Sequence, residues 1–225
     1  MAKKKNNTRA KVKEVSEDLT TTENFLDRNR KTIILLSGAI LAVLVGYIGY
    51  LKFIKEPAEV ASQEEIWNAF YAFENDSTQI AIDGTENFSG MEYIADKYKG
   101  TSGGDISNYA MGIMSMENGE FETALDYLDN CSFEDVMIGN LCIGLQGDCY
   151  VELGEYKKAA KYFQNAANRE ANEFTSPMFL KKAGLALEEL GETSKANKLY
   201  TKIKTEYANS EVASDIDKYI GRTNS

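Results

Sequence analysis

The side chains in this sequence that could most readily take part in catalysis are carboxylates. Neighbouring carboxylates, the arrangement used by general acid and base pairs, occur at Glu64 and Glu65, Glu120 and Glu122, and Glu134 and Asp135. The chain has no histidine, which removes His-based triads, most zinc sites and the usual general base. It also has no glycine-rich phosphate loop, dinucleotide fingerprint or EF-hand calcium loop. We therefore interpret the acidic pairs as solvated helix faces, and expect no enzyme activity, cofactor or metal.

The three cysteines are the other reactive groups. Cys142 and Cys149 are seven residues apart on one expected helix, roughly 10 Å by helical rise, which is beyond disulfide reach. Cys131 falls at a small, apolar position of a repeated pattern, so we interpret it as a buried apolar residue. A bridge from Cys131 to Cys142 or Cys149 stays open if the compartment is oxidising.

The elements that would position these groups follow one pattern written three times between residues 107 and 207. Its anchors are Gly112, Gly147 and Gly184, which are 35 and 37 residues apart, a period typical of helical repeats. The same residue types recur at fixed offsets in all three copies: Gly119, Gly154 and Gly191; Ala124, Ala159 and Ala196; Leu128, Phe163 and Tyr200; and Cys131, Ala166 and Ile203.

A glycine inside a helix costs roughly 1 kcal/mol relative to alanine, so its recurrence predicts a second helix crossing close to it. We expect the alanines at offset twelve to be the matching small positions on that second helix. The second glycine of each copy should end the first helix in the left-handed conformation. Each copy is therefore predicted to be an antiparallel helix pair. A generic helical bundle with coincidental spacing is the alternative.

The middle copy resembles the tetratricopeptide repeat almost residue for residue, at Gly147, Tyr150, Gly154, Tyr156, Ala159, Phe163 and Ala166. The resemblance implies an all-α solenoid with three clear helix pairs over residues 105–208. We expect a degenerate first pair with an irregular loop over residues 55–104, and a C-terminal capping helix over residues 209–225.

The N-terminal part has a different composition. Residues 1–31 carry nine Lys or Arg and are predicted to form a flexible basic tail in the cytoplasm, with a targeting or nucleic-acid tract as the alternative. Residues 32–51 are uncharged and mainly apolar, and as a helix they would span about 30 Å, the thickness of a bilayer core. The segment 32–54 is therefore predicted to be a single transmembrane helix.

The flanking charges predict its orientation. Nine Lys or Arg precede the span and two follow it closely, which places the N-terminus in the cytoplasm and the repeats outside. A cleaved signal peptide is the competing interpretation, but the apolar run is too long and no clean cleavage site follows. Residues 56–225 carry a net charge of −16, which would repel phosphate backbones and anionic headgroups. We expect protein partners, and neither nucleic acid nor a small-molecule substrate.

By analogy with the repeat family, the first helix of each pair would line a protein-binding groove. The predicted groove residues, an apolar strip with acidic spots, are Ile106, Tyr109, Ile113, Met116, Leu141, Asp148, Val151, Met178, Lys181, Leu185 and Glu188. Such a strip suits an extended or helical apolar segment, although several of these side chains could instead pack against neighbouring helices.

The whole layout resembles the YfgM-like ancillary subunits of the bacterial SecYEG translocon. This resemblance implies a single-pass inner-membrane protein whose periplasmic repeats act beside the channel, in the manner of a chaperone, with periplasmic chaperones and unfolded secreted chains as partners. A static assembly scaffold for an envelope or cell-surface secretion complex is the alternative.

Overall fold

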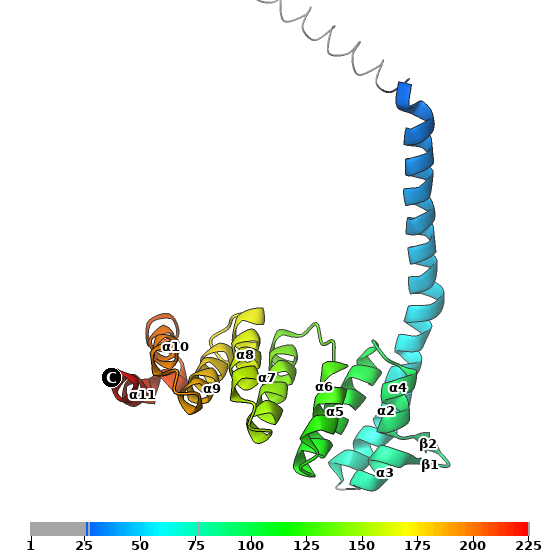
Figure 1. Ribbon diagram of the computed structural model, residues 1–225. Helices are drawn as coiled ribbons and strands as arrows, with labels where there is room; N and C mark the ends of the chain where they lie inside the picture. Colours follow the sequence, from blue (N-terminus) through cyan, green and yellow to red (C-terminus); the bar gives the residue numbers. More distant parts are fainter. Residues whose placement is uncertain (1–25, 27, 76, 225) are drawn as a thin grey trace, which may run out of the picture. The chain divides into compact units, whose positions relative to one another are not determined.

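The computed structural model describes residues 26, 28–75 and 77–224. The chain divides into two compact units, Met1–Glu56 and Pro57–Ser225. Most of the predicted basic tail lies outside the described residues, so its flexibility stays a prediction. In the second unit, the helices follow one another in a row in chain order, as Figure 1 shows from green to red.

The N-terminal unit is helical throughout residues 28–50 and continues through a π-helical turn, η1, Leu51–Lys55. Its large apolar side chains are exposed, with Leu35 and Val43 each at 71%. The helix to which it contributes, Arg28–Glu74, is long and apolar enough to cross a membrane. Side chains of this kind on the outside of a helix are what a lipid environment requires.

The second unit begins with α2, Glu56–Glu74, and α4, Met91–Lys97. Between them we expected an irregular connection, which is wrong in part. The segment contains a short helix, α3, Thr78–Asp83, and a two-residue antiparallel pairing of β1, Gly84–Thr85, with β2, Phe88–Ser89. Ile66 of α2 and Met91 and Ile94 of α4 form one buried cluster with α5, so this degenerate pair shares the core of the repeats.

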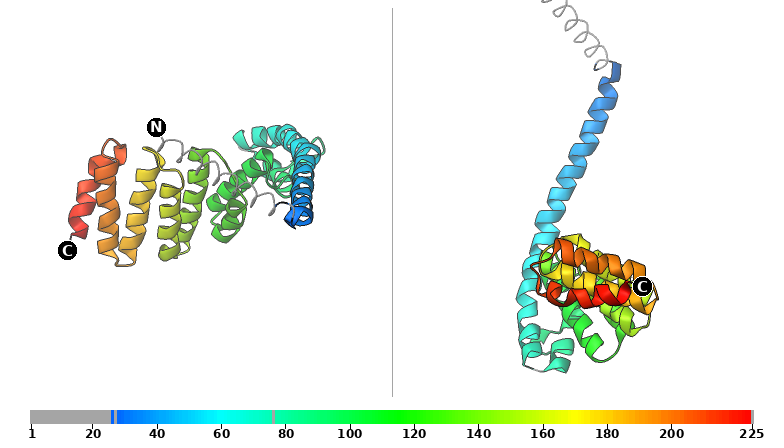
Figure 2. Two further views of the ribbon diagram at one scale, coloured as in Figure 1. Left: turned by 90° about the horizontal axis from the view of Figure 1, so that it is seen from above. Right: turned by 90° about the vertical axis from the view of Figure 1, so that its left-hand side faces the viewer.

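Three antiparallel helix pairs follow, and Figure 2 shows them side by side from above. The first helices of the pairs are α5, Ser102–Glu117, α7, Val136–Glu152, and α9, Thr175–Glu189. The second helices are α6, Phe121–Asp129, α8, Tyr156–Arg169, and α10, Thr193–Glu206. Helix α5 starts slightly earlier than the predicted boundary at residue 105, because the Thr101 hydroxyl caps it by accepting from the Gly104 amide.

The turn inside each pair is set by the second glycine of the pattern. Gly119, Gly154 and Gly191 have φ of 77°, 71° and 72°, which confirms the predicted left-handed helix ends. In the first turn, the Gly119 amide donates to Met116 O at 3.0 Å and the Glu120 amide donates to Ser115 O at 2.8 Å. This pair of hydrogen bonds satisfies the last carbonyls of α5 and brings the chain straight into α6.

The first glycine of each pair makes room for one large side chain of the second helix. A Cβ at Gly147 would lie 2.6 Å from the Phe163 ring, and a Cβ at Gly184 would overlap the Tyr200 ring. At Gly112 it would lie 2.7 Å from Leu128. The predicted close crossing is therefore present. The residues sixteen positions after each glycine fill the space nearest to it. The alanines at offset twelve are fully buried on the second helices, and the Ala124 carbonyl lies 3.6 Å from a Cβ built at Gly112.

The chain ends in a cap formed by η2, Glu211–Asp215, and α11, Ile216–Thr223. Ile216 is 1% exposed and joins the core of the last pair. Gly221, which aligns with the anchors, has no atom within 4 Å of a Cβ built on it. The cap therefore packs on the last pair without a close crossing at this glycine.

The glycine contacts predict that substitutions at Gly147 and Gly221 change the stability of the fold by very different amounts. Gly147→Leu should lower the free energy of unfolding by about 3 kcal/mol or more, because the added side chain has to displace Phe163. Gly221→Leu is the matched control and should be neutral or stabilising, since leucine favours a helix more than glycine by up to about 1 kcal/mol. Thermal unfolding of both variants by circular dichroism measures this, and equal melting temperatures would contradict the packing described above.

Candidate functional site

A hollow of about 440 Å³ lies between the first helices α7 and α9, with α8 behind it. We call it the first-helix hollow. Its lining consists of Asp148, Val151, Tyr156, Phe163, Lys182, Leu185, Ala186 and Glu189. The structure thus brings together three of the predicted groove residues, Asp148, Val151 and Leu185, around one opening.

The walls of the hollow combine apolar side chains with one ion pair. Lys182 Nζ lies 2.7 Å from Asp148 Oδ2, and it also stands over the Phe163 ring at 5.5 Å from the centroid. Leu185 is 38% exposed beside them. The ion pair joins α7 to α9 and leaves apolar surface open next to a fixed charge pair, an arrangement suited to a peptide that carries both apolar and polar groups.

Most of the other predicted groove residues are half-buried and pack into the cores. Ile106, Leu141 and Met178 pack against buried clusters. Met116 packs on the cluster of the first pair, and Ile113 is half-buried on the same helix. The Tyr109 ring meets Phe133 edge to face, with centroids 5.9 Å apart, and burial raises the pKa of Tyr109. None of these side chains lines the hollow, so their part in binding stays a prediction.

Lys181 and Glu188 are engaged by the C-terminal cap. Lys181 Nζ lies 3.1 Å from Asp215 Oδ1. Arg222 donates to both Glu188 oxygens at 2.8 Å, and Tyr200 donates its hydroxyl to Glu188 Oε1. Burial works to raise the pKa of Glu188, but the hydrogen bonds from Arg222 and Tyr200 outweigh it and lower that pKa. Both predicted groove residues therefore hold the cap in place.

Sequence reasoning missed these partners, although a signal was present. Lys182 with Asp148, Lys181 with Asp215 and Arg222 with Glu188 are each separated by 34 residues, close to one repeat period. Opposite charges at that spacing fall at neighbouring positions of adjacent repeats, so a search at the repeat period would have found them.

Two of the carboxylates and all three cysteines have structural surroundings. Our interpretation of Glu65 as a solvated charge is wrong, because its carboxylate accepts from the Tyr98 hydroxyl and from Lys97 Nζ at 3.1 Å. Asp135 caps α7 by accepting from the Ile138 amide. The three cysteines are free thiols, and burial raises the pKa of Cys149 to about 11, which disfavours the nucleophilic thiolate.

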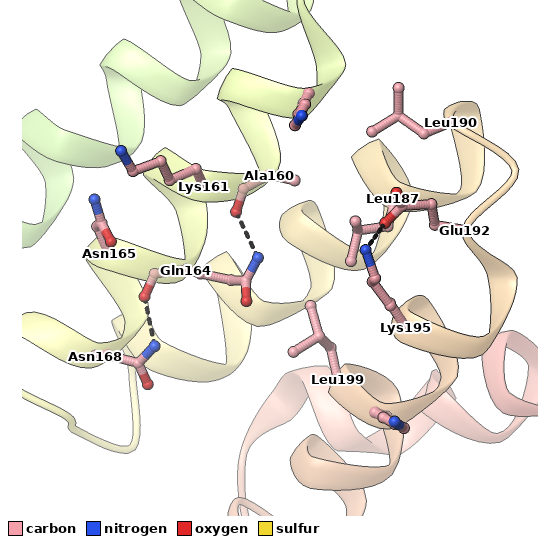
Figure 3. Close-up of a pocket in the computed structure, with 12 residues that line it drawn as sticks. Ala160, Lys161, Gln164, Asn165, Asn168, Leu187, Leu190, Glu192, Lys195 and Leu199 are labelled. Atoms are coloured by element: carbon pink, nitrogen blue, oxygen red, sulfur yellow. Dashed lines mark hydrogen bonds and ion pairs between the residues drawn. The ribbon is translucent and has the colours of Figure 1, made fainter.

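A second opening lies between the second helices α8 and α10 and measures about 580 Å³ (Figure 3). We call it the basic cleft, because it is lined by four lysines and one acid: Lys157, Lys161, Lys195, Lys198 and Glu192. In Figure 3, Leu187 lies between Leu190 and Leu199, and Gln164 of α8 donates to the Ala160 carbonyl of its own helix. Sequence reasoning missed this cleft, although Lys161 and Lys198 stand at the same offset from Gly147 and Gly184.

A smaller opening of about 250 Å³ lies between α4 and α6. We call it the acidic cleft, because three carboxylates and one lysine line it: Glu92, Asp96, Asp126 and Lys99. Asn108 of α5 and Tyr127 of α6 complete the walls. Burial is the main cause that raises the pKa of Tyr127, and the negative charges of Glu92 and Glu120 add to it.

Comparison with known families supports the repeat assignment. The family model of the tetratricopeptide repeat matches residues 145–172 and 182–210. These two ranges fall in the second and third helix pairs. The predicted fold class, an all-α tetratricopeptide-repeat solenoid preceded by an apolar helix, is confirmed. No curated protein matches the chain. Tetratricopeptide repeats are typically non-catalytic modules that bind proteins, so the match suggests a protein-protein interaction scaffold.

The cap contacts of Glu188 predict a dependence of stability on pH. Because its folded-state pKa lies below the usual value of 4.5, the ionised carboxylate stabilises the fold at neutral pH, and this contribution is lost as the pH falls through the lowered folded-state pKa. Glu188→Gln should therefore lower the free energy of unfolding by about 1 kcal/mol at neutral pH. As the pH falls, the free energy of unfolding should decrease less in this variant than in the wild type. Glu189→Gln, at the exposed neighbour, is the control. Denaturant unfolding between pH 3 and pH 7, at intervals of about half a unit, checks this. Identical pH profiles for the two variants would contradict it.

Proposed function

We propose that the repeats bind an apolar, extended or helical segment of another protein in the first-helix hollow. The observation that carries this proposal is the exposed apolar wall around Leu185, set beside the Asp148 and Lys182 pair. An opening of about 440 Å³ falls within the size range of ligand pockets and accepts apolar side chains. The ion pair supplies a donor and an acceptor for the polar groups of the bound segment.

We also propose a place for this activity in the cell. The apolar helix anchors the chain in a bacterial inner membrane as a single span, with the N-terminus in the cytoplasm and the repeats in the periplasm. The excess of Lys and Arg before the span supports this orientation. The layout resembles the YfgM-like subunits of the Sec translocon. The bound segments would therefore belong to secreted or envelope proteins that emerge from the channel, and periplasmic chaperones would bind the same proteins.

Site-specific photo-crosslinking in intact cells tests the binding proposal. A photoreactive residue at Leu185 should give crosslinks to emerging secreted chains and to the channel, because this side chain borders the hollow. The same probe at Phe174, which is 75% exposed but does not line the hollow, is the matched control and should give at least about tenfold less.

The crosslinked products separate the alternatives. Many different secreted chains at Leu185 support transient holding, whereas one stoichiometric partner would replace it with a static assembly scaffold. Equal crosslinking yields at Leu185 and Phe174 would overturn the proposal. So would a pull-down of this protein from membranes that recovers neither the channel nor its periplasmic partners.

Protease protection tests the orientation. Protease added outside intact spheroplasts should remove residues beyond 57 and leave an N-terminal fragment that contains the span. The same treatment of intact cells, whose outer membrane excludes the protease, is the control. Protection of the repeats in spheroplasts would place them in the cytoplasm.

A further inference from the structure

The basic and acidic clefts are built in the same way. Each lies between two successive helices of the second type, with the intervening first helix contributing to the walls: α9 in the basic cleft and α5 in the acidic cleft. The first-helix hollow instead lies between two first helices, α7 and α9, with the second helix α8 contributing to its walls. The two clefts therefore share one face of the repeats, and the hollow is outside it.

The two clefts carry opposite and uncompensated charges. In the basic cleft, Glu192 pairs with Lys195 at 2.6 Å, which leaves Lys157, Lys161 and Lys198 without an ion pair among the described residues. In the acidic cleft, the three carboxylates form no ion pair within the described part of the chain, and Lys99 is the one cation that lines it. A basic surface of this kind stands out because residues 56–225 carry a net charge of −16.

We propose that this face binds a second copy of the chain in an antiparallel, twofold-symmetric contact. A twofold axis through the face places the basic cleft of one copy against the acidic cleft of the other, and the reverse contact forms at the same time. The dimer therefore contains two equivalent contacts, each between a basic cleft and an acidic cleft.

Apolar groups in the clefts add to the charge contact. Leu190 is 40% exposed at the edge of the basic cleft, next to Leu187 and Leu199. Tyr127 and Ala95 line the acidic cleft. The occupant that fits the three lysines left without an ion pair among the described residues is a protein surface with clustered carboxylates, which the acidic cleft of a second copy provides.

Charge reversal in the full-length chain tests this contact. The lysine variant carries Lys157→Glu, Lys161→Glu and Lys198→Glu; the carboxylate variant carries Glu92→Lys, Asp96→Lys and Asp126→Lys. Two differently tagged forms of the full chain are purified together in detergent, and co-capture of one tag by the other measures self-association. The wild type should self-associate, and raising the salt from about 0.05 M to about 0.5 M should weaken this.

Each variant alone should lose at least about tenfold in self-capture, because both clefts then carry the same charge. Mixing the lysine variant with the carboxylate variant should restore capture, since every contact is again between opposite charges. Glu117→Lys, Glu134→Lys and Glu173→Lys, at exposed acids outside both clefts, form the matched control and should leave self-capture unchanged. Melting curves confirm that every variant is folded.

Several results would overturn the proposal. A monomeric wild type that instead binds a polyglutamate peptide through the three lysines would assign the basic cleft to a different acidic protein. Folded variants that self-associate like the wild type, or a mixture without recovery, would exclude pairing of the clefts. Crosslinking at Leu185 is separate from all of these outcomes, so failure here and failure of the binding proposal are distinguishable.

Discussion

The structure depends on one contact repeated along the chain, in which a large side chain of the second helix fills the space left by a glycine of the first. Phe163 lies against Gly147 and Tyr200 against Gly184, and both rings are almost fully buried. Burial of such a side chain stabilises the fold by roughly 1.5–3 kcal/mol. Gly144 does the same between pairs, where the Phe179 ring leaves no space for a Cβ. Helices held this closely leave little freedom in how successive pairs stack.

Close stacking of two kinds of helix produces two kinds of opening. Neighbouring first helices enclose the first-helix hollow, and neighbouring second helices enclose the basic and acidic clefts. The first opening is mostly apolar with one ion pair, whereas the others are defined by charge. The two kinds of opening lie between different sets of helices, so they present chemically different surfaces.

The end of the stack is held by charges at the repeat spacing. Asp215 and Arg222 of the cap bind Lys181 and Glu188 of α9, one period away, much as Lys182 of α9 binds Asp148 of α7. Exposed ion pairs contribute little individually, but here they accompany buried Ile216 and the Tyr200 hydroxyl. The cap thus takes over contacts that a further repeat would otherwise make.

The sequence by itself determined the helix pairs, their glycine turns and the apolar helix, because these follow from local periodicity and from backbone conformations that glycine favours. Of the predicted groove, Asp148, Val151 and Leu185 line one opening, and their part in binding stays a prediction. Tertiary structure alone decided that Leu128, Phe163 and Tyr200 occupy the glycine spaces, and that Lys181 and Glu188 bind the cap. It also decided which lysines gather in the basic cleft. These outcomes depend on the rotation of each helix about its axis against its neighbours, and repeat spacing alone leaves that rotation unspecified.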